Sequence, residues 1–196
     1  VDSMQTEIDK DFNEVVADLK EDWVRNSKGE SNIGNWIADT QRDAARAQVG
    51  FMNSGGIRTN VSAGPLTKRK LFEVLPFRST LVTFQISGKQ LRECVLHGLR
   101  NDDPLELSGI RVQWKKKMDG SAEILKMEVG GKPLNEKENY ICAASDFLVG
   151  QGKKYLGMEI PQAVFLKQTV FEAAEAAARK AKIISTKVEG RIVQVQ

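Results

Sequence analysis

The sequence predicts a mixed α+β domain in which helices are layered around mixed sheets. Segments of β-type composition alternate along the chain with segments of helical periodicity. Residues 109–116 and 122–129 alternate apolar and polar residues around the turn MDGS, which predicts a β-hairpin and argues against a purely parallel, helix-crossed sheet. The 196 residues contain no internal repeat and no change of composition that would mark a second domain.

The N-terminal part of the chain has two readings. Apolar residues in 3–22 recur at close to helical spacing, which predicts a helix. The end of this run, VVADLKEDWV, fits a strand equally well, so both readings stay open. Residues 30–48 predict a helix with a clear apolar face, and Ser31 or Asn32 can cap its N-terminus.

The remaining elements follow from composition and turn residues. A short apolar strand, VGFMN, leads into the turn SGGIRTNVSAG, and a short helix at 66–75 ends before Pro76. The later segments alternate between the two types: strand 79–87, helix 88–99, the hairpin, strand 140–145, a glycine-rich loop 147–157, helix 169–182 and a last strand within 188–195.

Composition excludes several classes of function. The net charge of +3 is too small to indicate nucleic acid as the default partner. No stretch approaches the roughly 18 apolar residues of a membrane span, and the polar start VDSMQTEIDKDF does not resemble a signal peptide.

The counts of histidine and cysteine limit the chemistry of this chain. Its single histidine, His97, cannot by itself build a histidine-rich metal centre, so no metal ligand set is assigned to this chain. A Ser-His or Cys-His catalytic device would have to use His97. Two cysteines, Cys94 and Cys142, could form one disulfide, but small secreted scaffolds are usually richer in cysteine. We expect both to be small buried apolar residues, and the pattern does not decide whether they pair.

A turn after the strand VGFMN has the composition of an anion-binding site. It reads Asn53-Ser54-Gly55-Gly56-Ile57-Arg58. Paired glycines allow a sharp turn that brings backbone N–H groups close to an anion. Arg58 could bind a phosphate or carboxylate through two N–H groups, and the Asn53 amide could donate a further hydrogen bond. The alternative is a plain tight turn that carries a surface arginine.

Two phenylalanines stand beside turn residues. Phe77 follows Pro76, and Phe147 opens the glycine-rich loop. Together they could hold a flat ring such as a nucleobase, although each by itself could equally be a core residue. The loop GQGKK is not a phosphate-binding P-loop, because Phe147 and Lys154 stand where that motif needs glycine and Ser or Thr.

Taken in order, the motifs GNWIAD, NSGGIR, LPF, SGKQL, LSGIRV, SDFL and VEGRI resemble the C-terminal domain of the 5'-nucleotidase family, which includes UDP-sugar hydrolases and 2',3'-cyclic phosphodiesterases. The resemblance covers about residues 25–195. It implies a 5'-nucleotidase-like substrate-binding domain at 25–196, preceded by a linker helix or N-terminal extension at 1–24.

The resemblance also implies roles for individual residues. Asn53 and Arg58 match residues that contact the phosphate, with Gly55 and Gly56 forming the turn that places them, and Phe77 and Phe147 match the pair that holds the base. Lys153 stands where the family usually has an aspartate that accepts hydrogen bonds from the ribose. A lysine cannot accept a hydrogen bond, so a more anionic ligand or an inactive pocket becomes possible.

In that family, two divalent metals in a separate metallophosphoesterase domain carry out the hydrolysis. We therefore expect this chain to recognise a nucleotide or nucleoside, to work with such a domain in cis or in trans, and to be inactive alone. A non-catalytic binding module or separate subunit is the alternative. Family members are mostly periplasmic or extracellular, which is the localisation that the resemblance implies.

Overall fold

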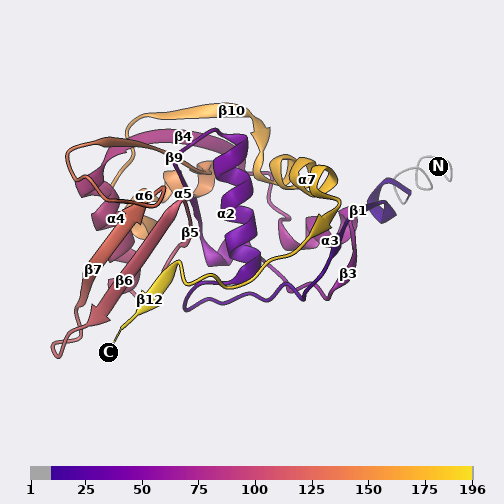
Figure 1. Ribbon diagram of the computed structural model, residues 1–196. Helices are drawn as coiled ribbons and strands as arrows, with labels where there is room; N and C mark the ends of the chain where they lie inside the picture. Colours follow the sequence, from indigo (N-terminus) through magenta and orange to yellow (C-terminus); the bar gives the residue numbers. More distant parts are fainter. Residues whose placement is uncertain (1–9, 196) are drawn as a thin grey trace.

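The computed structural model describes residues 10–195, and it is built from three sheets with helices between and beside them (Figure 1). The five-stranded sheet has the order β10-β4-β9-β2-β5. Its strands, in chain order, are β2 (Val49–Met52), β4 (Thr80–Ser87), β5 (Glu106–Ser108), β9 (Asn139–Ser145) and β10 (Ala163–Thr169). Strands β2 and β9 run parallel, and every other pair in this sheet is antiparallel.

Two smaller sheets flank this central sheet. The three-stranded sheet has the order β11-β1-β3, and the four-stranded sheet has the order β12-β6-β7-β8. Their strands are β1 (Val15–Leu19), β3 (Gly64–Thr67), β11 (Ile183–Ile184), β6 (Ile110–Lys116), β7 (Ala122–Val129), β8 (Lys132–Pro133) and β12 (Ile192–Gln194). The predicted hairpin is β6–β7, which extends away from the rest of the fold in Figure 1.

The helices are α2 (Asn32–Ala44), α3 (Lys68–Val74), α4 (Gly88–Arg100), α5 (Asp146–Gly150), α6 (Gly152–Tyr155) and α7 (Val170–Ala181), with a 3₁₀ turn η1 (Ser54–Gly56). Of these helices, all except α6 begin after a residue whose side chain accepts a hydrogen bond from the first turn. The cap of α2 is Ser31, whose hydroxyl oxygen accepts from the Gly34 N–H at 3.0 Å. The mixed α+β prediction is confirmed, as are the longer predicted helices and strands.

Helix α2 lies at the centre of the fold and packs against β2 and β5 (Figure 1). Its buried residues Ile33, Ile37 and Ala38 join one large apolar cluster, which also contains the fully buried Trp23. A second cluster fills the space between α4, the central sheet and the hairpin. It contains Cys94 and Cys142, which are buried as expected. Both are free thiols, which answers the question of pairing that the sequence left open, and burial raises the pKa of Cys94 to about 12.

Two sequence-based expectations need correction. Residues 10–13 are helical, but Val15–Leu19 form β1, the middle strand of its sheet, so the strand reading of this segment is right. Residues 20–22 are not helical, and residues 3–9 of the predicted helix lie outside the described residues. The predicted glycine-rich loop 147–157 instead contains α6 and most of α5. Ser145 caps α5 by accepting from the Leu148 N–H at 3.1 Å, and this local capping lets a glycine-containing segment turn helically.

Candidate nucleotide-binding site

The topology of the central sheet brings two separate turns close together. Because β2 and β9 are parallel neighbours, the segments that follow them emerge at the same end of the strands. Asn53 follows β2, and Phe147 lies two residues after β9. A cavity of about 400 Å³ opens there, lined by Met52, Asn53, Gly55, Gly56, Arg58, Leu75, Phe77, Ser79, Ser145, Phe147, Tyr155 and Val170. The structure thus brings six of the seven predicted site residues to one cavity.

Asn53 offers a buried amide to this cavity. The residue is only 4% exposed, and its side chain makes no hydrogen bond within residues 10–195. Its backbone carbonyl accepts from the Gly56 N–H at 3.0 Å, which closes the η1 turn. A Cβ at position 56 would lie 2.5 Å from the Met52 methyl group, which is the flexible end of that side chain and would have to move. The amide is therefore free to bind a ligand.

Arg58 supplies the positive charge of the cavity. Its Nη1 donates to the Gly55 carbonyl at 2.9 Å, and its guanidinium carbon lies 5.9 Å from the centre of the Phe77 ring. Within the described part of the chain no carboxylate pairs with this guanidinium. Most of its N–H donors thus remain available for an anion, and guanidinium suits two-pronged binding of phosphate or carboxylate.

Two phenyl rings line the cavity while remaining half exposed. Phe77 is 53% exposed and Phe147 is 51% exposed. Phe77 follows the end of α3, whereas Phe147 lies in the first turn of α5 and packs at 6.0 Å against the Tyr155 ring with an interplanar angle of 55°. Large apolar groups left in contact with water beside a cavity are typical of a ligand-binding surface.

Lys153 lies apart from these residues. It does not line the cavity but a neighbouring hollow formed by residues 149–154 and 159–161. Its ammonium pairs with Glu159 at 2.7 Å, and both side chains are more than 70% exposed. Exposed pairs of this kind contribute about 0–1 kcal/mol, so this pair holds Lys153 only weakly.

Three polar lining residues were not predicted from the sequence. Ser79 precedes β4 and Ser145 ends β9. Both line the cavity, because the start of β4 lies beside the end of β9, where Leu81 pairs with Ser145. Both serines lie at the ends of predicted strands, and this position could have identified them in the sequence as candidate site residues. Tyr155 was missed because it belongs to α6, a short helix in a segment whose glycines predict a loop.

A buried carboxyl group lies behind the cavity wall. Glu106 on β5 pairs in register with Met52, and both its oxygens accept hydrogen bonds from Ser31, one from the hydroxyl and one from the backbone N–H. Burial, together with the nearby negative charge of Glu30, raises the pKa of Glu106 to about 7, although the Ser31 hydrogen bonds oppose the shift. A Cβ at position 34 would overlap this carboxyl group, so Gly34 is required there.

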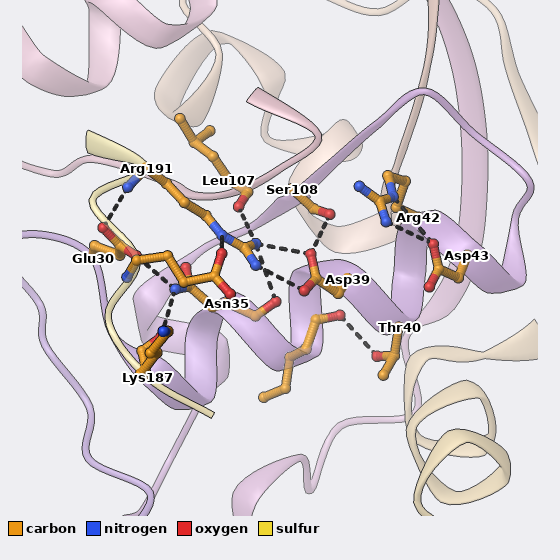
Figure 2. A network of polar contacts seen from close by, with 12 residues as sticks. Glu30, Asn35, Asp39, Thr40, Arg42, Asp43, Leu107, Ser108, Lys187 and Arg191 are labelled. Atoms are coloured by element: carbon orange, nitrogen blue, oxygen red, sulfur yellow. Dashed lines mark hydrogen bonds and ion pairs between the residues drawn. The ribbon is translucent and has the colours of Figure 1, made fainter. Parts of the chain in front are cut away.

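A polar network on the same helix fixes the C-terminal segment (Figure 2). The Arg191 guanidinium donates through two nitrogens to the two oxygens of Asp39, both at 2.8 Å, and to the Leu107 carbonyl at 2.7 Å. Glu30 accepts from the backbone N–H groups of Glu189 and Arg191. These contacts join α2, β5 and the approach to β12 without using any residue of the cavity.

The described residues contain neither a metal centre nor a membrane span. Within residues 10–195, no group of three or more histidine, cysteine, aspartate or glutamate side chains is arranged to hold a metal ion. The family resemblance places its pair of metals in a separate domain, and no chemical step is assigned to a metal in this chain. No helix in the same range is long and apolar enough to cross a membrane.

The fold and the cavity together define a mixed α/β domain with a cavity where strands β2 and β9 of its central sheet end. The family described as "5'-nucleotidase, C-terminal domain" matches residues 15–158, and the chain belongs to this family.

Several known proteins resemble the chain. The trifunctional nucleotide phosphoesterase protein YfkN of Bacillus subtilis is 28% identical over 200 residues, which covers 94% of this chain and 14% of YfkN. An apyrase of Tabanus yao is 30% identical over 168 residues, covering 71% of this chain and 30% of the apyrase. This chain therefore spans less than a third of either curated relative.

Solved structures agree with this membership. The 5'-nucleotidase precursor of Thermus thermophilus superposes with a TM-score of 0.85 at 27% identity, covering 99% of this chain and 42% of that one. The NAD nucleotidase of Haemophilus influenzae superposes with a TM-score of 0.84 at 16% identity, which shows a shared fold.

Proposed function

We propose that this chain is the nucleotide-recognition domain of a metal-dependent 5'-nucleotidase-type phosphohydrolase. The observation that carries the proposal is the composition of one cavity. A guanidinium without a carboxylate partner among the described residues and a buried amide without a hydrogen bond lie beside two half-exposed phenyl rings. A nucleotide is a ligand that joins a flat apolar ring to an anionic group, and it matches both features.

The base is proposed to lie between Phe77 and Phe147. Stacking on an aromatic side chain contributes about 1–3 kcal/mol per base and needs no particular hydrogen-bonding pattern. The rings lose exposed area when the base enters, so the hydrophobic effect adds to the stacking. The two rings would therefore favour a flat base in the cavity but would not determine which base binds.

The phosphate is proposed to bind Arg58 and the Asn53 amide beside the Gly55-Gly56 turn. Hydrogen bonds between a guanidinium and a phosphate are charge-assisted and about twice as strong as neutral ones. The existing bond from Arg58 to the Gly55 carbonyl holds the guanidinium beside the turn before the ligand arrives. That preorganisation lowers the entropy cost of binding.

Hydrolysis is assigned to a metallophosphoesterase domain that holds two divalent metals and acts in cis or in trans. The metals would activate the attacking water there. This chain would orient the base and the phosphate, which can account for several kcal/mol of a reaction barrier. We propose that it is inactive alone and that the protein works in the periplasm or outside the cell.

A second candidate is a nucleoside- or nucleotide-binding module without a catalytic partner. Lys153 favours this candidate, because the residue at the position expected to bind ribose is turned into an ion pair with Glu159. Co-purification of a metallophosphoesterase with the native protein, or its presence in the same polypeptide, would support the first proposal over this one.

Calorimetric titration of this chain with AMP and adenosine tests the binding site. We expect AMP to bind more tightly than adenosine, Arg58→Ala to remove that difference, and Phe147→Ala to weaken both ligands about tenfold or more, since one stacked ring contributes about 1–3 kcal/mol.

Matched controls are Arg111→Ala and Phe165→Ala, whose side chains are exposed outside the cavity. Both control variants should bind as the parent does. Equal affinity of the parent for adenosine and AMP would contradict the role of Arg58, and no binding of either ligand would overturn the assignment of the cavity.

A further inference from the structure

One buried hydroxyl group has a hydrogen that none of the described residues accepts. The buried serine and threonine side chains of residues 10–195 are Ser31, Thr40, Ser108 and Ser145. The hydroxyls of Ser31 and Ser108 donate to carboxylate oxygens, and that of Thr40 donates to a backbone carbonyl. Within the same range Ser145 donates to no group, and among these four residues it alone lines the cavity.

The oxygen of the Ser145 hydroxyl already has a partner. It accepts from the Leu148 N–H at 3.1 Å, which is the contact that caps α5. The group that still needs a partner is therefore the hydroxyl hydrogen, and a buried donor left without an acceptor costs free energy. A ligand in the cavity can supply the missing acceptor.

Ser145 lies in the inner part of the cavity. It ends β9, which lies between β4 and β2 in the central sheet. Phe77 shortly precedes β4, and Phe147 follows Ser145 by two residues. Both rings are half exposed, whereas Ser145 is only 5% exposed. A flat base between the two rings would therefore have its inner edge nearest to the Ser145 hydroxyl.

We propose that Ser145 is a specificity-determining residue whose hydroxyl donates a hydrogen bond to a carbonyl oxygen on the inner edge of the base. The preferred substrate class is then nucleotides of oxo-substituted bases such as hypoxanthine, over those of amino-substituted bases such as adenine. An amino group at that edge is a donor and would leave the Ser145 hydrogen without an acceptor. The inference rests on the proposed function, since it assumes that a base occupies the cavity.

Calorimetric titration of the parent chain with IMP and AMP tests the proposal. The two nucleotides share the ribose and the phosphate, so contacts with Asn53 and Arg58 cancel in the ratio of their dissociation constants. We expect IMP to bind about 3- to 10-fold more tightly than AMP, which is the range of one neutral hydrogen bond. Equal affinities, or tighter binding of AMP, would overturn the role of Ser145 and leave the proposed function standing. Binding of neither nucleotide would overturn both proposals.

Variants of Ser145 separate its hydroxyl donor from its capping role. In Ser145→Ala we expect the two affinities to come within about twofold of each other, because loss of the α5 cap acts on both nucleotides alike through Phe147, whereas loss of the donor changes their ratio. Ser145→Gly is a second variant without the hydroxyl, and glycine is tolerated at an N-cap at little cost. An unchanged ratio in either folded variant would overturn the proposal.

Two further variants are controls. Ser145→Thr keeps both the donor and the accepting oxygen, so it should keep the ratio of the parent. Ser87→Ala removes the corresponding cap of α4, which lies outside the cavity, and should change neither the two affinities nor their ratio.

Discussion

Glu106 shows how one side chain couples packing to pH. Its carboxyl group is 1% exposed and is enclosed by α2 on one side and by β2 on the other. The groups that face it are Ser31, Glu30 and Arg191. Because burial disfavours the ionised form, the folded chain binds this proton more tightly than the unfolded chain does.

This shift predicts a pH-dependent stability. Between about pH 4.5 and pH 7 the folded state holds more protons at Glu106 than the unfolded state, so its contribution to stability is present at low pH and is lost as pH rises. The loss is on the order of 3 kcal/mol. In Glu106→Gln it should be absent, and urea unfolding at pH 5 and pH 8 would measure this.

The matched control for that experiment is Glu73→Gln, which changes an exposed glutamate on α3. It should keep the pH dependence of the parent. If Glu106→Gln also keeps that dependence, the buried carboxyl group is not the source of it.

At the scale of single elements, α7 depends on a capping box beside the cavity. The Thr169 hydroxyl accepts from the Glu172 N–H at 3.1 Å, and the Glu172 carboxylate accepts from the Thr169 N–H at 2.8 Å. Val170, the next residue, lines the cavity and donates its N–H to the Ser79 carbonyl. The cap thus fixes both the helix start and one part of the cavity wall.

We expect Thr169→Ala to lower the free energy of unfolding by about 1 kcal/mol, which is the typical contribution of such a cap. Thr169→Ser keeps the accepting oxygen and should lose less than half of that amount. The midpoint of urea unfolding measures both variants. An alanine variant as stable as the parent would show that the cap is not needed.

The elements that the sequence predicted share long, regular patterns. Helix α2 and strand β4 have unbroken helical or β-type patterns, and the hairpin β6–β7 has both alternation and a turn signal. Strands β8 and β11 contain only two residues each, which is too short for any periodicity. Strand β10 lies at the sheet edge and is largely exposed, so its sequence has no buried face to reveal it.

The candidate site follows the same division. Asn53 and Arg58 could be predicted because a buried strand runs directly into a paired-glycine turn, which is a local signal. Phe77 and Phe147 meet the same cavity because Phe77 shortly precedes β4 and the start of β4 pairs with the end of β9. The family resemblance, not the local pattern, indicated that the two rings belong together. Neither source indicated Tyr155, because its direction depends on the short helix α6.

At the scale of the whole molecule, Arg191 joins segments that are far apart in the sequence (Figure 2). Arg191→Ala would leave the Asp39 carboxylate and the Leu107 carbonyl without this partner. We expect a loss of about 3 kcal/mol in unfolding free energy, at the lower end of the range for breaking a buried pair because Asp39 is 34% exposed.

Arg111→Ala is the matched control for this network. The Arg111 side chain is exposed and donates one hydrogen bond to the Glu189 carbonyl, so its loss should cost less than about 1 kcal/mol. Chemical denaturation distinguishes the two variants. Similar losses in both would indicate that burial of the Arg191–Asp39 pair adds nothing to stability.

The single histidine gives this chain an internal spectroscopic probe. His97 Nε2 lies 2.8 Å from the Lys154 carbonyl, and this contact requires a hydrogen on Nε2 because a carbonyl can only accept. With one imidazole in the sequence, its nuclear magnetic resonances need no assignment. They would report directly on the junction between α4 and α6, so a ligand that moves α6 through the Tyr155 ring should shift them, while a ligand held only at Arg58 should leave them in place.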